Sequence, residues 1–144
     1  MADLVSRAGA DLDGSGSVTE RVTRYMRRES AALRGCPVGR LTMDPDVMAD
    51  QELRRPVEEA FAAVRRRLAE VLDEGCVNGE LDPSVDPVAT ATALVAVLQG
   101  GYVLARAAGS ADTYTQAVEG ILALLACSPR NGEVTWRTSA ERSC

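Results

Sequence analysis

The stretch between Asp86 and Arg106 constrains the fold more than any other part of this 144-residue chain. No charged residue lies between these two positions, and the run PVATATALVAVLQGGYVLA is apolar around the whole circumference of a helix. Such a helix has to be buried on every side. A chain of this length buries only part of its surface, so we expect a second subunit to cover what the chain's own core leaves exposed.

The same stretch is long enough to raise the question of a membrane span. It is rich in alanine and threonine, it contains Gln99 and the Gly100-Gly101 pair, and no basic cluster flanks it. Small residues of this kind suit close packing of helices inside a protein. We therefore expect a buried helix and no membrane association.

The composition favours an all-α protein. Hydrophobic residues make up 46% of the chain but aromatic residues only 3%, so alanine, valine and leucine must build the core. The formal net charge is -5, which argues against direct nucleic-acid binding because phosphate binding needs a basic surface. Histidine is absent, and with it the commonest general base and metal ligand.

Capping signals and apolar spacing predict a bundle of about five helices. The box Ser17-Val18-Thr19-Glu20 starts a helix expected to end at Gly35. A second long helix is expected from Asp50 to about Glu74, where Gly75 ends it and Arg66 pairs with Glu70. Turn-forming residues follow, and the last two helices are expected over 87–108, capped by Asp86, and 112–126, capped by Ser110 or Asp112. One or two helical turns are expected in the segment that holds Leu41, Met43 and Met48.

Catalytic and metal-binding patterns are weak. Cys36 lies after a predicted helix, but a nucleophilic cysteine needs a neighbouring base that the chain does not supply as histidine. The four cysteines are far apart, and the loop DLDG lacks the spacing of a calcium site. We expect no catalytic residue, no metal and no cofactor. Free thiols and the lack of a signal peptide indicate a cytoplasmic protein.

Four segments, in this order, carry a resemblance to a known family: GCPVGRL (35–41), EGCVNGELDPSVDPVATA (74–91), LQGGYVLARA (98–107) and YTQAVEGILALL (114–125). The chain resembles the C-terminal regulatory domain of TetR-family transcriptional repressors over about residues 17 to 127. It is most similar to the subgroup of multidrug-responsive regulators.

The resemblance implies an all-α domain whose last two helices pair with those of a second subunit in a four-helix bundle. It also implies an internal pocket for a small, mostly apolar effector. Residues 17–127 are then the effector-binding and dimerisation domain, residues 1–16 a remnant of the linking helix and loop, and residues 128–144 a polar tail. The family's N-terminal helix-turn-helix region is absent, so we expect a truncated chain that does not bind operator DNA alone.

Two sets of residues follow from the predicted helix faces rather than from the family. Large or deformable side chains at helical spacing are usually core residues, but they also suit an adaptable pocket. The predicted ligand-binding residues are Tyr25, Met26, Met43, Met48, Phe61, Val64, Leu98 and Tyr102. The predicted dimer-interface residues are Val95, Gly100, Gly101, Val118, Ile121, Leu122 and Leu125.

Other functions remain open from sequence alone. The chain also fits a ligand-free helical module that pairs with an intact repressor and disables it. A small helical enzyme is the third alternative, which the absence of any triad or metal-ligand spacing argues against.

Overall fold

The computed structural model describes residues 9–28 and 32–127, and these residues form helices and connecting loops without a strand. A helical turn at residues 9–12 precedes six helices. The helices are α2 (Val18–Arg27), α3 (Pro37–Leu41), α4 (Pro45–Ala49), α5 (Gln51–Val77), α6 (Pro87–Ala108) and α7 (Asp112–Ala126). The all-α prediction is confirmed. Residues 128–144, predicted as a polar tail, lie outside the described residues.

Side-chain caps fix the ends of the long helices. Asp86 Oδ1 accepts hydrogen bonds from the backbone N–H groups of Val88 and Ala89 at 2.9 and 3.0 Å, which starts α6. Gly109 ends it in the left-handed conformation, with φ of 64°. In α2, Ser17 and Glu20 form the predicted reciprocal capping box. The predicted bounds of the last two helices are therefore confirmed.

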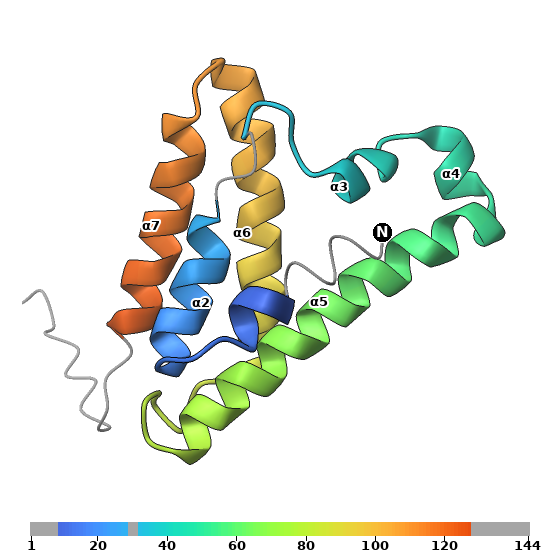
Figure 1. The fold of residues 1–144 in the computed structure, drawn as a ribbon. Helices are drawn as coiled ribbons and strands as arrows, with labels where there is room; N and C mark the ends of the chain where they lie inside the picture. The colour runs from blue at the N-terminus through green and yellow to red at the C-terminus, as the bar shows by residue number, and fades with distance from the viewer. Residues whose placement is uncertain (1–8, 29–31, 128–144) are drawn as a thin grey trace, which may run out of the picture.

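α6 is the central helix of the fold (Figure 1). It packs against α5 on one side and against α7 on another, and α2 contacts both α5 and α7. The short helices α3 and α4 contact α5 and lie near its N-terminal half. The largest fully buried side chains are Leu12, Val18, Val22, Met26, Leu68, Val71, Leu72, Leu94 and Val118.

Three local predictions are wrong. The first helix ends at Arg27 rather than at Gly35, because Arg28 leaves helical geometry with ψ of 106°. Gly75 does not end α5 but lies buried within it. A Cβ at Gly75 would lie 2.9 Å from both Leu81 Cδ1 and Val18 Cγ1, so this glycine permits close packing. Arg67 takes the place predicted for Arg66 and pairs with Glu70 at 2.9 Å.

The last helix begins at Asp112 as predicted, but its cap differs in part from the prediction. Its N-cap position is Ala111, whose side chain caps nothing, whereas Ser110 Oγ accepts from the N–H of Asp112 at 3.1 Å. Ser110 therefore supports the start of α7 from one residue further upstream.

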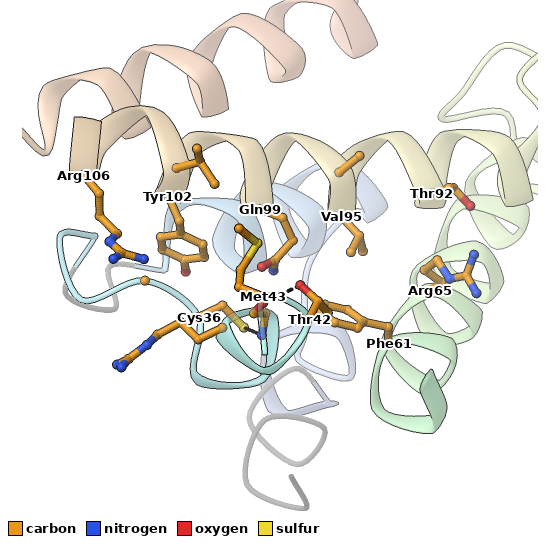
Figure 2. A pocket seen from close by; sticks show the side chains of 15 residues that line it. Cys36, Thr42, Met43, Phe61, Arg65, Thr92, Val95, Gln99, Tyr102 and Arg106 are labelled. Atoms are coloured by element: carbon orange, nitrogen blue, oxygen red, sulfur yellow. Dashed lines mark hydrogen bonds between the residues drawn. The ribbon is translucent and has the colours of Figure 1, made fainter. Parts of the chain in front are cut away.

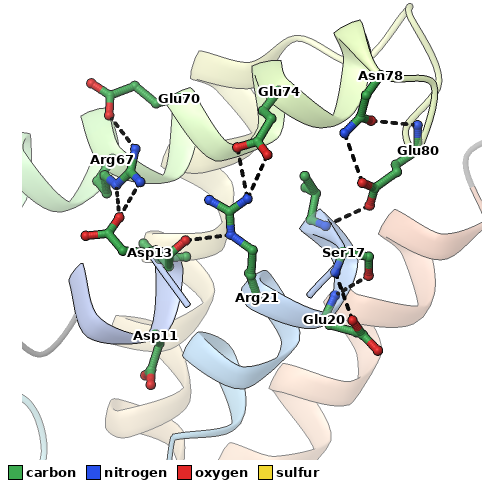
Figure 3. A network of polar contacts seen from close by, with 12 residues as sticks. Asp11, Asp13, Ser17, Glu20, Arg21, Arg67, Glu70, Glu74, Asn78 and Glu80 are labelled. Carbon is green, nitrogen blue, oxygen red and sulfur yellow. Dashed lines mark hydrogen bonds and ion pairs between the residues drawn. The ribbon is translucent and has the colours of Figure 1, made fainter. Parts of the chain in front are cut away.

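Arg21 joins three segments of the chain (Figure 3). Its side chain is buried, and its Nε donates to the carbonyl oxygen of Leu12 at 2.6 Å. Its Nη1 donates to both carboxylate oxygens of Glu74 at 2.9 Å, which ties α2 to α5. Because Leu12 is itself fully buried, this arginine satisfies a backbone acceptor that water does not easily reach.

Replacing Arg21 by methionine is expected to lower the free energy of unfolding by about 2 kcal/mol, because the Leu12 carbonyl loses its partner. Glu74→Gln is the control. Half of the Glu74 side chain is exposed, and a charge pair of this kind contributes about 1 kcal/mol or less. Urea denaturation of both variants measures the difference. Equal stability of Arg21→Met and the parent chain would contradict this account.

α6 is long and apolar enough, by length and composition, to cross a membrane, and a third of its most apolar window is buried. Its packing between α5 and α7 gives these apolar residues a protein environment. Part of α6 stays apolar and exposed in the single chain, with Val88, Val103 and Leu104 more than half accessible.

Candidate functional site

A cavity of about 400 Å³ lies between α6, α5 and the segment that contains α3. Figure 2 shows the side chains that line it: α6 forms one wall, α5 contributes Phe61 and Arg65, and the α3 segment lies opposite α6. This volume lies within the range of about 300–1,000 Å³ that is typical of small-molecule sites. The lining residues are Gly35, Cys36, Gly39, Arg40, Thr42, Met43, Phe61, Arg65, Thr92, Val95, Ala96, Gln99, Tyr102, Val103 and Arg106.

The α3 segment is held in place by its own cap and by a small hydrophobic cluster. The Cys36 thiol accepts a hydrogen bond from the N–H of Gly39 at 3.3 Å and caps α3. Cys36 and Val38 pack with Val57 and Ala60 of α5. A Cβ at Gly39 would lie 2.1 Å from Gln99 Oε1, so the lack of a side chain at Gly39 lets the Gln99 side chain of α6 lie directly against α3.

The lining combines apolar surface with a few polar groups. Phe61, Val95 and Met43 present apolar side chains, and Met43 is 81% exposed at the edge of the cavity. Thr42 Oγ1 donates to the carbonyl oxygen of Gly39 at 2.7 Å. The side-chain amide of Gln99 makes no hydrogen bond to any described residue and is available to a bound molecule. Such a lining suits a mostly apolar ligand that a few polar contacts orient.

Tyr102 connects the cavity to the core, because it lines the cavity and stacks on a tyrosine that is buried in the core. The rings of Tyr102 and Tyr114 have centroids 4.8 Å apart, and the Tyr114 hydroxyl donates to the carbonyl oxygen of Met26 at 3.4 Å. Burial raises the pKa of Tyr114 well above its usual value, and burial does the same to the pKa of Tyr25. The phenols of Tyr114 and Tyr25 are therefore neutral at physiological pH.

The comparisons with known proteins decide the family. The family model for the tetracyclin repressor-like C-terminal domain matches residues 16–121, which is most of the chain. The chain belongs to the TetR family. No curated protein sequence matches it.

A solved TetR-family structure has the same fold. The transcriptional regulator of the TetR family from Cytophaga hutchinsonii is similar over 84% of this chain, with a TM-score of 0.73 and 21% sequence identity. The similar region spans 63% of that regulator. The TetR family is a family of transcriptional regulators rather than of enzymes. The multidrug-responsive subgroup stays a prediction.

In this TetR domain the predicted ligand-binding residues fall into three groups. Met43, Phe61 and Tyr102 line the cavity. Met26, Val64 and Leu98 are buried in the core, and Tyr25 packs against that core. Met48 lies on α4, 36% exposed, and does not line the cavity.

The predicted dimer-interface residues divide in the same way. Val95, Gly101 and Val118 are buried inside the single chain, and Val95 also lines the cavity. A Cβ at Gly101 would lie 3.1 Å from Tyr114 Cδ2, so this glycine allows α7 to approach α6. A Cβ at Gly100 would meet nothing within 4 Å, so this glycine faces outward. Partly exposed on α7 are Ile121, Leu122 and Leu125.

Several lining residues were missed in the sequence, although α6 carries a signal for them. Thr92, Val95, Gln99, Tyr102 and Arg106 follow steps of three, four, three and four, which is one face of a helix. This face holds most of the polar side chains of an otherwise apolar helix. The residues from the α3 segment had no comparable signal, because a helix of five residues depends on its tertiary contacts.

Metal chemistry finds no support in the described ranges. Within residues 9–28 and 32–127, no group of three or more cysteine, aspartate or glutamate side chains is arranged to hold a metal ion. Cys36, Cys76 and Cys127 are free thiols. The cavity between α3, α5 and α6 is the candidate functional site of this TetR domain, because its volume and lining suit a small molecule.

Proposed function

We propose that this chain binds a small, largely apolar effector in the cavity between α3, α5 and α6. The observation that carries the proposal is the cavity itself: about 400 Å³ with a mainly apolar lining, in a domain that belongs to a family of regulators. Phe61, Val95 and Met43 supply the apolar surface, while Gln99 and Thr92 offer hydrogen bonds. A ligand that binds only the folded chain must raise its melting temperature.

We also propose that the domain forms a homodimer through the outward faces of α6 and α7. Along α6 this outward face consists of Ala93, Val97, Gly100, Leu104 and Ala107, and along α7 of Ala117, Gly120 and Leu124. Leu104 is 52% exposed and Leu124 69%. Leaving such an apolar surface in water is unfavourable, and a second copy of the same surface would cover it.

Replacing Phe61 by alanine is expected to leave a folded chain that no longer gains stability from apolar compounds. Phe61 is only partly buried, so the folded chain tolerates the loss, whereas the cavity loses its one aromatic side chain from α5. Thermal melting with and without an apolar compound library measures the effect. Leu53→Ala is the control, because Leu53 lies on the same helix, is 52% exposed and does not line the cavity.

The two variants separate binding at the cavity from binding elsewhere. The parent chain and Leu53→Ala should share the same stabilising compounds, and Phe61→Ala should lose most of the increase in melting temperature. If Phe61→Ala responds like the parent chain, the effector does not occupy this cavity. If no compound stabilises any of the three chains, the effector proposal fails and a ligand-free interaction module becomes the better account.

A further inference from the structure

The positive charges around the cavity distinguish it from the rest of the molecule. Arg40, Arg65 and Arg106 all line it, and no aspartate or glutamate within residues 9–28 and 32–127 does. The whole chain carries a formal net charge of -5. The described lining therefore holds three arginines and no carboxylate, which is a local reversal of the molecule's overall charge.

These three arginines differ from most others in the described part of the chain by lacking a protein partner. Elsewhere arginines pair with carboxylates, as in Arg21–Glu74, Arg27–Glu119 and Arg28–Asp11. Among the described residues, the side chains of five arginines make no hydrogen bond or ion pair: Arg34, Arg40, Arg65, Arg66 and Arg106. Three of these five, Arg40, Arg65 and Arg106, line the cavity.

Two of the arginines lie at the two ends of the cavity, with apolar side chains between them. Figure 2 shows Arg106 at one end of the row of α6 side chains and Arg65 near Thr92 at the other end, with Val95 and Gln99 between them. Thr92 and Arg106 are 14 positions apart on α6, which corresponds to about 21 Å along the helix axis. A ligand with a single small head group therefore places that group at one end of this row, while the apolar body of the ligand lies along the middle.

We infer that the effector is an amphipathic anion, with an apolar body and one carboxylate that an arginine at the edge of the cavity binds. This inference rests on the proposed effector-binding function and specifies its ligand. An arginine guanidinium presents paired N–H donors that match a carboxylate, and such charge-assisted hydrogen bonds are stronger than neutral ones. The described lining holds no carboxylate that would repel the anion, and the Gln99 amide has no hydrogen-bond partner among the described residues.

Two sets of three probes test the charge preference, and within each set the apolar body is the same. The aliphatic set is decanoate, decanol and decylamine, and the aromatic set is 1-naphthoate, 1-naphthol and 1-naphthylmethylamine. Each probe is titrated into the full chain by calorimetry at pH 7.5. We expect at least one carboxylate to bind about tenfold or more tightly than its neutral and cationic counterparts. Higher salt should weaken this preference, because all three arginines are exposed.

Two triple variants with equal loss of charge locate the effect. Arg40→Gln/Arg65→Gln/Arg106→Gln is expected to remove the carboxylate preference, whereas Arg34→Gln/Arg54→Gln/Arg66→Gln removes three exposed arginines that do not line the cavity and should keep it. The three single variants then show which end holds the carboxylate. Circular dichroism confirms that each variant stays helical.

The outcomes separate this inference from the proposed function. If the neutral or cationic probes bind as tightly as the carboxylates, and Phe61→Ala weakens them, the cavity is an effector site but the anion preference is wrong. If both triple variants lose the preference equally, the effect is one of net charge and the inference is also wrong. If no probe of either set binds, both the site and its charge preference are contradicted.

Discussion

Replacing Gly101 by leucine is expected to lower the free energy of unfolding by about 3 kcal/mol, because the new side chain has no space between α6 and α7. Even a single added carbon would lie 3.1 Å from Tyr114 Cδ2 and 3.7 Å from Ala117 Cβ. Tyr114 is buried and stacks on Tyr102, so its ring has little freedom to move away. The two helices have to separate, and the wall of the cavity moves with them.

Gly100 supplies a matched control one residue earlier in the same helix. A Cβ at Gly100 would meet nothing within 4 Å, so Gly100→Leu adds the same side chain without a clash inside the chain. Leucine is a better helix former than glycine, so this change should stabilise a single chain by up to about 1 kcal/mol.

The comparison is best made by urea denaturation in a chain that also carries Leu104→Glu and Leu124→Glu, so that association does not contribute to stability. If Gly101→Leu and Gly100→Leu shift the midpoint in the same direction, the assignment of Gly101 to the contact between α6 and α7 is wrong.

The sequence predicted the helices that have strong local signals. Asp86, Pro87 and Gly109 mark the ends of α6. Its apolar composition without charge predicted burial on every side, but in the single chain Val103 and Leu104 stay more than half exposed. Gly75 shows where local signals mislead, because a glycine that ends a helix and a glycine that permits close packing look the same in a sequence. Only the neighbouring Leu81 and Val18 distinguish the two roles.

The site was less predictable than the fold, for a related reason. Helical spacing places residues on a face, but it does not say which segment lies opposite that face. Phe61 and Tyr102 were predicted because large side chains at helical spacing suit a pocket, whereas Arg65 and Arg106 were not among the predicted residues. Their position beside an apolar cavity follows from the packing of α3 and α5 against α6, which the sequence does not show.

Replacing Leu104 and Leu124 together by glutamate is expected to convert the proposed dimer into a monomer, with a dissociation constant raised about 1,000-fold or more. Both side chains lie more than half exposed on the outward faces of α6 and α7, so neither change disturbs the core of the single chain. In a dimer, each subunit would have to bury two unpaired carboxylates against apolar surface, and this costs several kcal/mol.

Sedimentation equilibrium measures this effect directly, because the chain has a mass of 15.3 kDa and the dimer twice that. Thr115→Glu/Ala126→Glu adds the same two charges on the side of α7 away from the outward face and should leave the dimer intact. The Leu104→Glu/Leu124→Glu variant should also keep its response to compounds that bind the cavity, since neither Leu104 nor Leu124 lines it. A parent chain that sediments as a monomer at micromolar concentration would show that the outward faces of α6 and α7 do not pair. A dimer that both double variants leave unchanged would instead place the interface on another surface of the chain.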